Sequence, residues 1–251
     1  MSEKKPITRL LYYEDVYIKQ FQTKITQIVQ VDGRQGLVLE QTAFYPVGGG
    51  QQADNGVLKG KNWEAQVIDV QWRDDTLVHV LGEVRGEVKE QDNVLGEIDW
   101  NRRWALTRNH TAAHLVSPAI RQAVGEPLEI VGSAVYADKS RLDLGHEGSL
   151  RELFSKIEEI ANRVVAEDRP VLIGTMPRAE AERHVERFHE SLKALPSNIE
   201  NVRVVEIKDW HACACGGTHV TSTREVGAIR ILGRAAKGRG VERIEFAAKD
   251  P

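Results

Sequence analysis

Two pairs of residues have the side chains and the spacing of metal ligands. His110 and His114 are four residues apart, which on a helix places both imidazoles on one face, about 5–6 Å apart. Cys215 and His219 have the same spacing, but the two glycines between them favour a tight turn over a regular helix. A thiolate with three imidazoles is a donor set that suits tetrahedral zinc better than magnesium or calcium. The sequence therefore predicts one zinc site built from two distant segments.

Either pair alone also has a simpler interpretation. A histidine pair at this spacing occurs as a packed core or surface pair without metal, and Thr111 stands where a zinc protease needs a glutamate as general base. Cys213 can be a ligand, a neighbour of a ligand or a small buried residue, and we favour the last. His211 can likewise be an ordinary surface residue.

The expected zinc can be structural or catalytic, because closed tetrahedral sites stabilise folds and open sites perform chemistry. A chain of 251 residues can bury enough apolar surface to fold without a metal. The glycines beside Cys215 also allow another molecule to approach the backbone closely. Both points favour a catalytic site.

Composition limits the class of protein. Hydrophobic residues make up 41% and charged residues 28% of the chain, which is typical of a soluble globular protein. Only two cysteines are present, two residues apart, so they offer no long-range disulfide and indicate a reducing compartment. No apolar run is long enough for a signal peptide or a membrane span. We therefore expect a cytoplasmic protein without a membrane partner.

The pattern of residues changes near position 100. Before it, short runs rich in β-branched residues alternate with turn residues, and this predicts a small β-barrel of about six strands. Residues 101–125 then have the apolar periodicity of a helix, with Pro118 as a point where it can bend and Gly125 as its end. The expected domains are 1–99 and 100–251, in close contact at Asp99–Asn101.

The second half mixes helices and strands, so the fold class is α+β. Strands are expected at residues 129–136, 140–145, 171–177, 202–210, 225–232 and 241–248. Helices are expected at residues 149–168 and 178–188, the first with Ser149 as N-cap and Glu152 as its capping-box partner.

Charge is unevenly distributed along the chain. Residues 1–97 carry 11 Lys or Arg and 15 Asp or Glu, a net charge of -4, whereas residues 220–251 carry 7 and 4, a net charge of +3. Arg234, Lys237 and Arg239 lie on a turn rich in glycine and alanine, where they can contact a phosphate backbone. An ordinary solvated hairpin tip explains the same residues.

Several segments together resemble a known family. "NHTAAHL", "GSAVYADKSRLDLGH", "CACGGTHV", "EVGAIRIL" and "GVERIEF" occur in this order, and they resemble the editing domain of alanyl-tRNA synthetases and its free-standing relatives, the AlaX proteins. The upstream "TAFYPVGGGQQADNGVL" resembles the glycine-rich motif of the medium-sized AlaX group. The matches run from about Thr42 to Phe246, without an aminoacylation domain.

The resemblance implies an elongation-factor-like β-barrel packed on a zinc-containing α+β editing domain. It implies a hydrolase that acts in trans on alanine tRNA carrying a wrong amino acid, serine or glycine. Zinc would be held by His110, His114 and Cys215, with His219 as fourth ligand or as partner of a metal-bound water. Zinc can lower the pKa of a water to about 7 or polarise the ester carbonyl, or it can only position the aminoacyl end. The candidate catalytic residues are His219, Thr111 and Thr218.

The glycine-rich segment lacks the Lys and Ser or Thr of a phosphate-binding P-loop, and by itself it is a turn or bulge of the barrel. The resemblance implies that it contacts the catalytic domain and shapes access to zinc. The candidate residues for contact with substrate or tRNA are Thr42, Gly48, Gly49, Gly50, Gln51, Ser133, Arg234, Lys237 and Arg239. Thr42, Gln51 and Asp54 can instead hold the loop.

One departure from the family pattern concerns substrate choice. Ile130 and Val131 stand where relatives tend to have polar side chains, so the partner of a serine hydroxyl must come from elsewhere. Thr42, Thr111, Ser133 and Thr218 are the candidates. Two alternatives stay open: a tRNA-binding module with structural zinc, and an editing hydrolase for a threonyl-type substrate. Both a monomer and a homodimer are compatible with the sequence.

Overall fold

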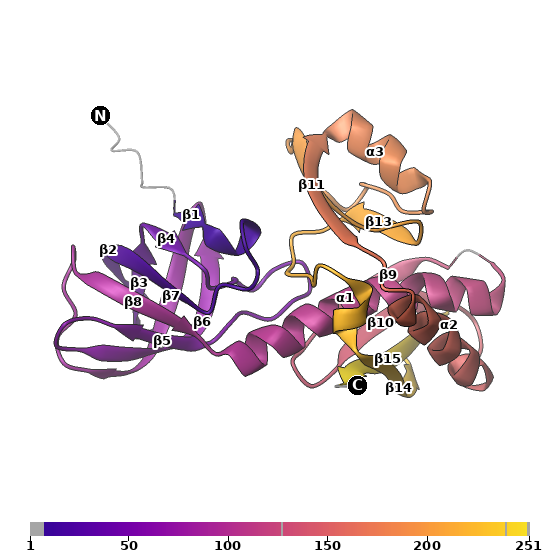
Figure 1. The fold of residues 1–251 in the computed structure, drawn as a ribbon, viewed down its shortest axis with the longest axis horizontal. Helices are drawn as coiled ribbons and strands as arrows, with labels where there is room; N and C mark the ends of the chain where they lie inside the picture. The colour runs from indigo at the N-terminus through magenta and orange to yellow at the C-terminus, as the bar shows by residue number, and fades with distance from the viewer. Residues whose placement is uncertain (1–7, 127, 239, 250–251) are drawn as a thin grey trace. The chain divides into compact units, whose positions relative to one another are not determined.

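The computed structural model describes residues 8–126, 128–238 and 240–249. The chain forms two compact units, Met1–Trp104 and Ala105–Pro251 (Figure 1). Strands dominate the first unit and the second combines helices with two sheets, so the predicted α+β class is confirmed. The domain limits 1–99 and 100–251 stay a prediction.

A closed six-stranded barrel forms the first unit, as the sequence predicts. Its strands follow the order β2-β3-β7-β6-β5-β8, and every paired neighbour is antiparallel. The strands are β2 (Gln20–Val31), β3 (Arg34–Leu39), β5 (Gly56–Lys59), β6 (Glu64–Arg73), β7 (Thr76–Arg85) and β8 (Asn93–Ile98). The short β1 (Arg9–Leu10) and β4 (Gln41–Thr42) pair in parallel, and a single 3₁₀ turn, η1 (Leu11–Tyr13), follows β1.

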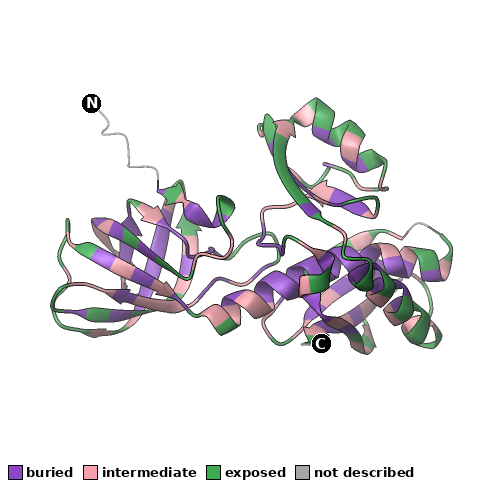
Figure 2. Cartoon of the chain, in the orientation of Figure 1, coloured by how far each residue is buried: buried purple, intermediate pink, exposed green. Residues whose placement is uncertain are grey.

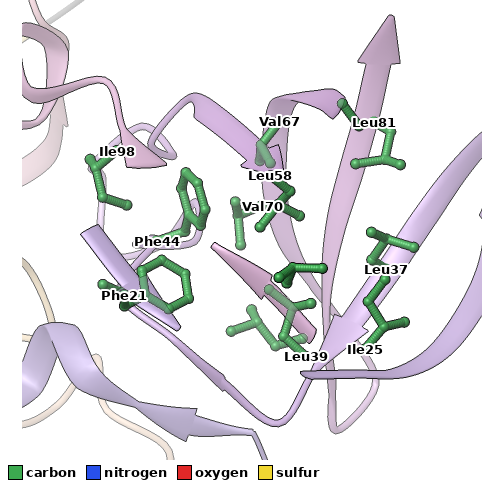
Figure 3. Close-up of a cluster of buried hydrophobic side chains, with 14 of the residues drawn as sticks. Phe21, Ile25, Leu37, Leu39, Phe44, Leu58, Val67, Val70, Leu81 and Ile98 are labelled. Carbon is green, nitrogen blue, oxygen red and sulfur yellow. The ribbon is translucent and has the colours of Figure 1, made fainter. Parts of the chain in front are cut away.

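Alternating side chains fill the barrel. Ile25, Leu37 and Leu58 are fully buried, and Figure 3 shows them gathered with Phe21 and Phe44 at its centre. Because the side-chain period of a strand is two, one face of each strand supplies this core. A second, smaller cluster of buried valines is formed by Val31, Val38, Val78 and Val80 of β2, β3 and β7. The first unit therefore has a hydrophobic core of its own.

A long helix, α1 (Trp100–Val124), follows the barrel and continues through Pro118. Asp99 caps its start by accepting a hydrogen bond from Arg102 N at 3.2 Å. Gly125, with φ of 91°, ends it as predicted. Residues 106–117 are all buried (Figure 2). Among the described helices, none is both long enough and apolar enough to cross a membrane.

An antiparallel sheet in the order β14-β15-β10-β9 lies in the second unit. Its strands are β9 (Ile130–Val135), β10 (Ser140–Gly145), β14 (Ala228–Ala236) and β15 (Val241–Lys249). Asn109 joins α1 to this sheet by donating to Tyr136 O at 2.9 Å and accepting from Ala248 N at 2.8 Å. Asn162 of α2 (Phe154–Ala166) makes a similar pair of bonds to the backbone of Ile229.

The predicted capping box at Ser149 and Glu152 is wrong, although Ser149 Oγ accepts a hydrogen bond from Arg151 N at 3.3 Å. A 3₁₀ turn, η2 (Arg151–Leu153), precedes α2, and neither element has a side-chain cap. Leu150 is buried and its N–H donates to Glu242 at 3.4 Å, which fixes the chain in a turn before the helix begins. A capping box occurs instead at Ser222 and Glu225 of η3 (Thr223–Val226).

A second, three-stranded sheet positions the cysteine segment. It consists of β11 (Val171–Pro177), β12 (Asn201–Ile207) and β13 (His211–Ala214), and α3 (Arg178–Glu186) packs on it. Val185, Val204 and Ala212 lie in their shared core. The sequence does not predict β13, which ends one residue before Cys215.

Candidate metal centre

Four side chains from the two segments paired in the sequence meet in the second unit. His110, His114, Cys215 and His219 each present a ligand atom, and these atoms all lie within 4.8 Å of one another. Cys215 Sγ is 3.4 Å from His110 Nε2 and 3.2 Å from His219 Nε2. Such a cluster of nitrogen and sulfur donors is the set that zinc prefers.

Local backbone structure explains the convergence. The spacing of His110 and His114 on α1 brings their ring centroids to 5.5 Å. Cys215 lies just after β13, where its N–H donates to Arg203 O at 3.1 Å and its carbonyl accepts from Arg203 Nη1 at 2.6 Å. These bonds to β12 fix the loop so that Cys215 faces α1.

Thr111 determines which nitrogen of His219 faces the cluster. The Thr111 hydroxyl donates to Thr107 O at 3.1 Å, so it accepts at its contact with His219 Nδ1, also 3.1 Å long. It accepts a further hydrogen bond from Val220 N at 3.2 Å. The proton of His219 is therefore on Nδ1, and the lone pair of Nε2 is directed at Cys215 and the cluster.

Burial keeps the imidazoles in the form that binds metal. It lowers the pKa of His110 to about 4, and the positive charge of Arg203 acts in the same direction. The pKa values of His114 and His219 also fall well below their ordinary value, mainly because of burial. All three rings are neutral at neutral pH, as metal ligands must be.

The thiol of Cys215 is in the opposite situation. Burial raises its pKa, while the Gly217 N–H, 3.4 Å from Sγ, and Arg203 act against the increase. A thiolate here needs further positive charge, and a divalent cation among the four ligand atoms supplies it. Cys215 and Gly216 are half-buried, whereas His110, His114 and His219 are buried. The donor set thus fits a zinc ion.

His211 is a correction to the sequence interpretation, because it is buried and not a surface residue. It is 3% exposed, and its Nε2 is 3.1 Å from Glu190 Oε1. Arg121 forms an ion pair with the same carboxylate. Arg203, Glu190 and Arg121 were all missed, because their pairing depends on the fold. The sequence contains a signal only for His211. It lies two residues before Cys213, so in an extended segment the two side chains point to the same face.

Of the predicted polar residues, two lie beside the ligands and one is on an edge strand. Thr218 Oγ1 is 2.8 Å from Thr107 Oγ1, and both residues are buried. Thr111 bonds to His219, as described above. Ser133 is an exposed residue of the edge strand β9.

The glycine-rich segment of the barrel unit is a tight, exposed turn. Gly48 and Gln51 pair through two backbone hydrogen bonds of 3.1 and 3.0 Å. Gly49 and Gly50, between them, have φ values of 57° and 81°, which a two-residue turn of the type I′ class requires. The backbone conformation of the turn therefore explains why positions 49 and 50 are glycines, in agreement with the turn interpretation.

Thr42, Gln51 and Asp54 are buried in the barrel unit. Thr42 Oγ1 bonds to His79 Nε2 at 2.8 Å, and Asp54 forms a fully buried ion pair with Arg103 while accepting from Tyr45 N at 2.6 Å. These bonds favour the second of the two predicted roles, in which the residues hold the loop.

The basic residues lie on the hairpin between β14 and β15. Arg234 forms an ion pair with Glu242, which is 1% exposed, through a contact of 2.6 Å between Nη2 and Oε2. Lys237 is exposed, and its N–H closes the turn by donating to Val241 O at 2.9 Å. Arg239 lies outside the described residues. The hairpin is as predicted, and Arg234 is already paired within the chain.

A surface cavity of about 390 Å³ lies near the end of α1. Pro118, Arg121, Phe188 and Trp210 are among its lining residues, and the four predicted ligands are not. Arg121 connects it to His211 through Glu190.

Two family models match parts of this chain. The family model described as "Threonyl and Alanyl tRNA synthetase second additional domain" matches residues 202–245. The model described as "tRNA synthetases class II (A)" matches residues 2–102.

Curated relatives match over nearly the full chain. An alanine–tRNA ligase of Ignicoccus hospitalis is 39% identical over 246 residues, which are 97% of this chain and 26% of the relative. Those of Pyrococcus abyssi and Methanopyrus kandleri are 41% and 40% identical, and the matches cover 96% and 99% of this chain and 26% and 27% of the relatives. The chain thus spans about a quarter of the length of the curated relatives it matches. The chain belongs to the family of alanyl-tRNA synthetase editing domains.

Proposed function

We propose that this chain is a zinc-dependent hydrolase that removes serine or glycine from wrongly charged alanine tRNA, acting in trans. The observation that carries the proposal is the cluster of His110, His114, Cys215 and His219, whose ligand atoms lie within 4.8 Å of one another. An aminoacyl ester is already an activated bond, so its hydrolysis needs chiefly a positioned water and stabilisation of developing negative charge. The match to alanine–tRNA ligases supports alanine tRNA as the partner.

The four ligand residues would hold the zinc ion. Bound zinc supplies a Lewis acid that polarises a carbonyl or lowers the pKa of a water. The chain's own contribution is to keep three imidazoles neutral by burial and to hold His219 through Thr111. The direction of His219 Nε2 favours the ligand role over contact with a metal-bound water.

Thr111 acts as a positioning residue in this proposal. Its single proton goes to Thr107 O, and its oxygen accepts from both His219 and Val220. A threonine hydroxyl has one donor and two acceptor positions, so all are used. Recognition of a serine hydroxyl would therefore rest on another group. Among the other predicted candidates, Thr218 directly precedes the ligand His219 in the sequence.

The test is to add purified chain to preformed seryl-, glycyl- and alanyl-tRNA(Ala) and to seryl-tRNA(Thr), with zinc measured in the same preparations. We expect hydrolysis of seryl- and glycyl-tRNA(Ala) and protection of alanyl-tRNA(Ala). Cys215→Ala should abolish hydrolysis and weaken zinc binding, because it removes the thiolate. The matched control is His184→Gln, because His184 is bonded to Glu206 and belongs to neither ligand cluster.

Each alternative predicts a different result. A binding module with structural zinc would bind tRNA, hold one zinc per chain and hydrolyse none of the substrates. A threonyl-type editing hydrolase would act on seryl-tRNA(Thr) in preference to the alanine tRNAs. Full hydrolysis by folded Cys215→Ala protein would contradict the proposed site itself.

A further inference from the structure

A second set of metal-ligand side chains lies beside the first. His114, His211 and Cys213 each present a ligand atom, and these atoms are also within 4.8 Å of one another. Cys213 Sγ is 3.9 Å from each ring nitrogen of His114, and the ring centroids of His114 and His211 are 5.0 Å apart. His114 belongs to both sets, so the two clusters overlap.

The orientation of His211 points to a ligand role. Glu190 is a carboxylate that only accepts hydrogen bonds, so the contact with His211 Nε2 places the ring proton on that nitrogen. The lone pair is then on Nδ1, which is buried and has no hydrogen-bond partner among the described residues. Buried polar atoms are nearly always paired, and carboxylate–histidine pairs of this kind recur where the other ring nitrogen binds a metal.

Glu190 is itself fixed in place. Arg121 forms an ion pair with it and also donates to Phe188 O at 3.3 Å and His189 O at 3.2 Å. β13 positions the other end of the cluster, because Cys213 pairs in register with Val205 and His211 with Ile207 of β12. Residues 211 and 213 are two apart on a strand, so their side chains lie on one face.

We propose that His114, His211 and Cys213 form a second binding position for a thiophilic divalent cation, an alternative to the four-ligand position for a single ion. Because both positions use His114, only one of them can hold an ion at a time. With three protein ligands and one of them shared, the second position binds more weakly than the first. It retains one thiolate, so it still holds a cation when Cys215 is replaced.

Cobalt titration of metal-free Cys215→Ser protein tests this directly. Co²⁺ bound by a thiolate has charge-transfer absorption in the near ultraviolet, and in this variant Cys213 is the only remaining cysteine. We expect one equivalent of Co²⁺ to bind with that absorption, at least tenfold more weakly than in the wild type. Absence of the absorption in folded Cys215→Ser protein overturns the proposal.

Two further substitutions in the Cys215→Ser background assign the ligands. Adding Cys213→Ser should remove the absorption, and adding His211→Gln should weaken Co²⁺ binding at least tenfold further. His184→Gln is the matched control, because His184 also bonds to a carboxylate, Glu206 at 2.8 Å, but lies in neither cluster. Equal affinity in the His211→Gln and His184→Gln proteins would overturn the assignment of His211.

A second route covers the case that Cys215→Ser does not fold, which circular dichroism would detect. His110→Ala combined with His219→Ala removes two ligands of the four-ligand position only and keeps both cysteines. We expect its Co²⁺ absorption to decrease when Cys213→Ser is added; absorption independent of Cys213 overturns the proposal. None of these measurements involves tRNA, so a failure of the proposed hydrolase activity is distinguished from a failure of this site.

Discussion

The hydroxyl of Thr111 fixes the tautomer of His219, and its removal tests how much that matters. Thr111→Val keeps the shape of the side chain but leaves His219 Nδ1 and Val220 N without their acceptor. Removal of a group that orients a ligand typically weakens metal binding about 10- to 100-fold. We expect a change of that size in the zinc dissociation constant, measured by competition with a chelator.

Thr111→Ser distinguishes this positioning role from a packing role. Serine keeps the hydroxyl and lacks the methyl group, so it should restore most of the affinity for zinc. If the valine and serine variants bind zinc equally well, His219 does not depend on this hydrogen bond.

His79, inside the barrel, makes stability depend on pH. Burial lowers its pKa to about 4, and its ring bonds to Thr42 Oγ1 and Leu37 O. In the unfolded chain a histidine has a pKa near 6.5, so below that pH the unfolded state binds a proton that the folded state does not. The stabilisation is complete above pH 6.5 and disappears as the pH falls to about 4, with a total of about 3 kcal/mol.

The pH effect can be assigned by substitution. Urea unfolding between pH 7 and 4 should show a smaller decrease in the free energy of unfolding for His79→Gln than for the wild type. Both proteins are measured without zinc. They share the histidines of the metal cluster, so the titration of those histidines affects both pH curves equally. Parallel pH curves would contradict a buried, neutral His79.

At the level of residues, the site could be predicted from the sequence where spacing alone determines the distance between two side chains. Four-residue spacing on a helix fixed the distance between His110 and His114 before their partners were known. Glu190 could not be recognised in this way, because its role depends on contacts with Arg121 and His211, from elements far apart in the chain. The burial of His211 also could not be predicted, because it results from the packing of segments that are far apart in the chain.

Among the elements, the turn of the glycine-rich segment gives a test with an internal control. Gly49 has a φ of 57°, where a side chain costs about 1–2 kcal/mol. Gly48 has no positive φ, and a Cβ there meets nothing closer than Tyr45 Oη at 4.0 Å. Gly49→Ala should therefore lower the free energy of unfolding by about 1 kcal/mol, and Gly48→Ala should change it by less than about 0.5 kcal/mol, as measured by urea denaturation.

Comparison of the two variants also tests the role of the loop. If the turn only closes the barrel, hydrolysis by folded Gly49→Ala protein should equal that of the wild type. A decrease of hydrolysis in both alanine variants, without a matching decrease of stability in Gly48→Ala, would indicate contact with substrate.

The strands of the barrel could be predicted because alternation and turn residues recur at each one. β13 could not, because "HACA" contains no β-branched residue and its pairing with β12 is decided by register across distant segments. The error at Ser149 has a similar origin, because the burial of Leu150 outweighs a local capping signal.

At the scale of the whole molecule, the uneven charge predicts salt-dependent binding of tRNA through the β14–β15 hairpin. Arg234 is held by the buried Glu242, so its removal would leave the fold with an unpaired buried carboxylate. Lys237 is exposed and offers the cleaner test. Removing one side chain that binds a phosphate should reduce the slope of log K against log salt by about 0.7–0.9.

Lys237→Ala should therefore weaken tRNA binding at low salt and make the slope shallower by the amount expected for roughly one phosphate. The control is Lys61→Ala, which removes an equal charge from an exposed position of the barrel unit, where residues 1–97 have a net charge of -4. Filter binding at several potassium concentrations measures both slopes. A slope that changes equally in the two variants would mean that net charge, and not the hairpin, governs binding.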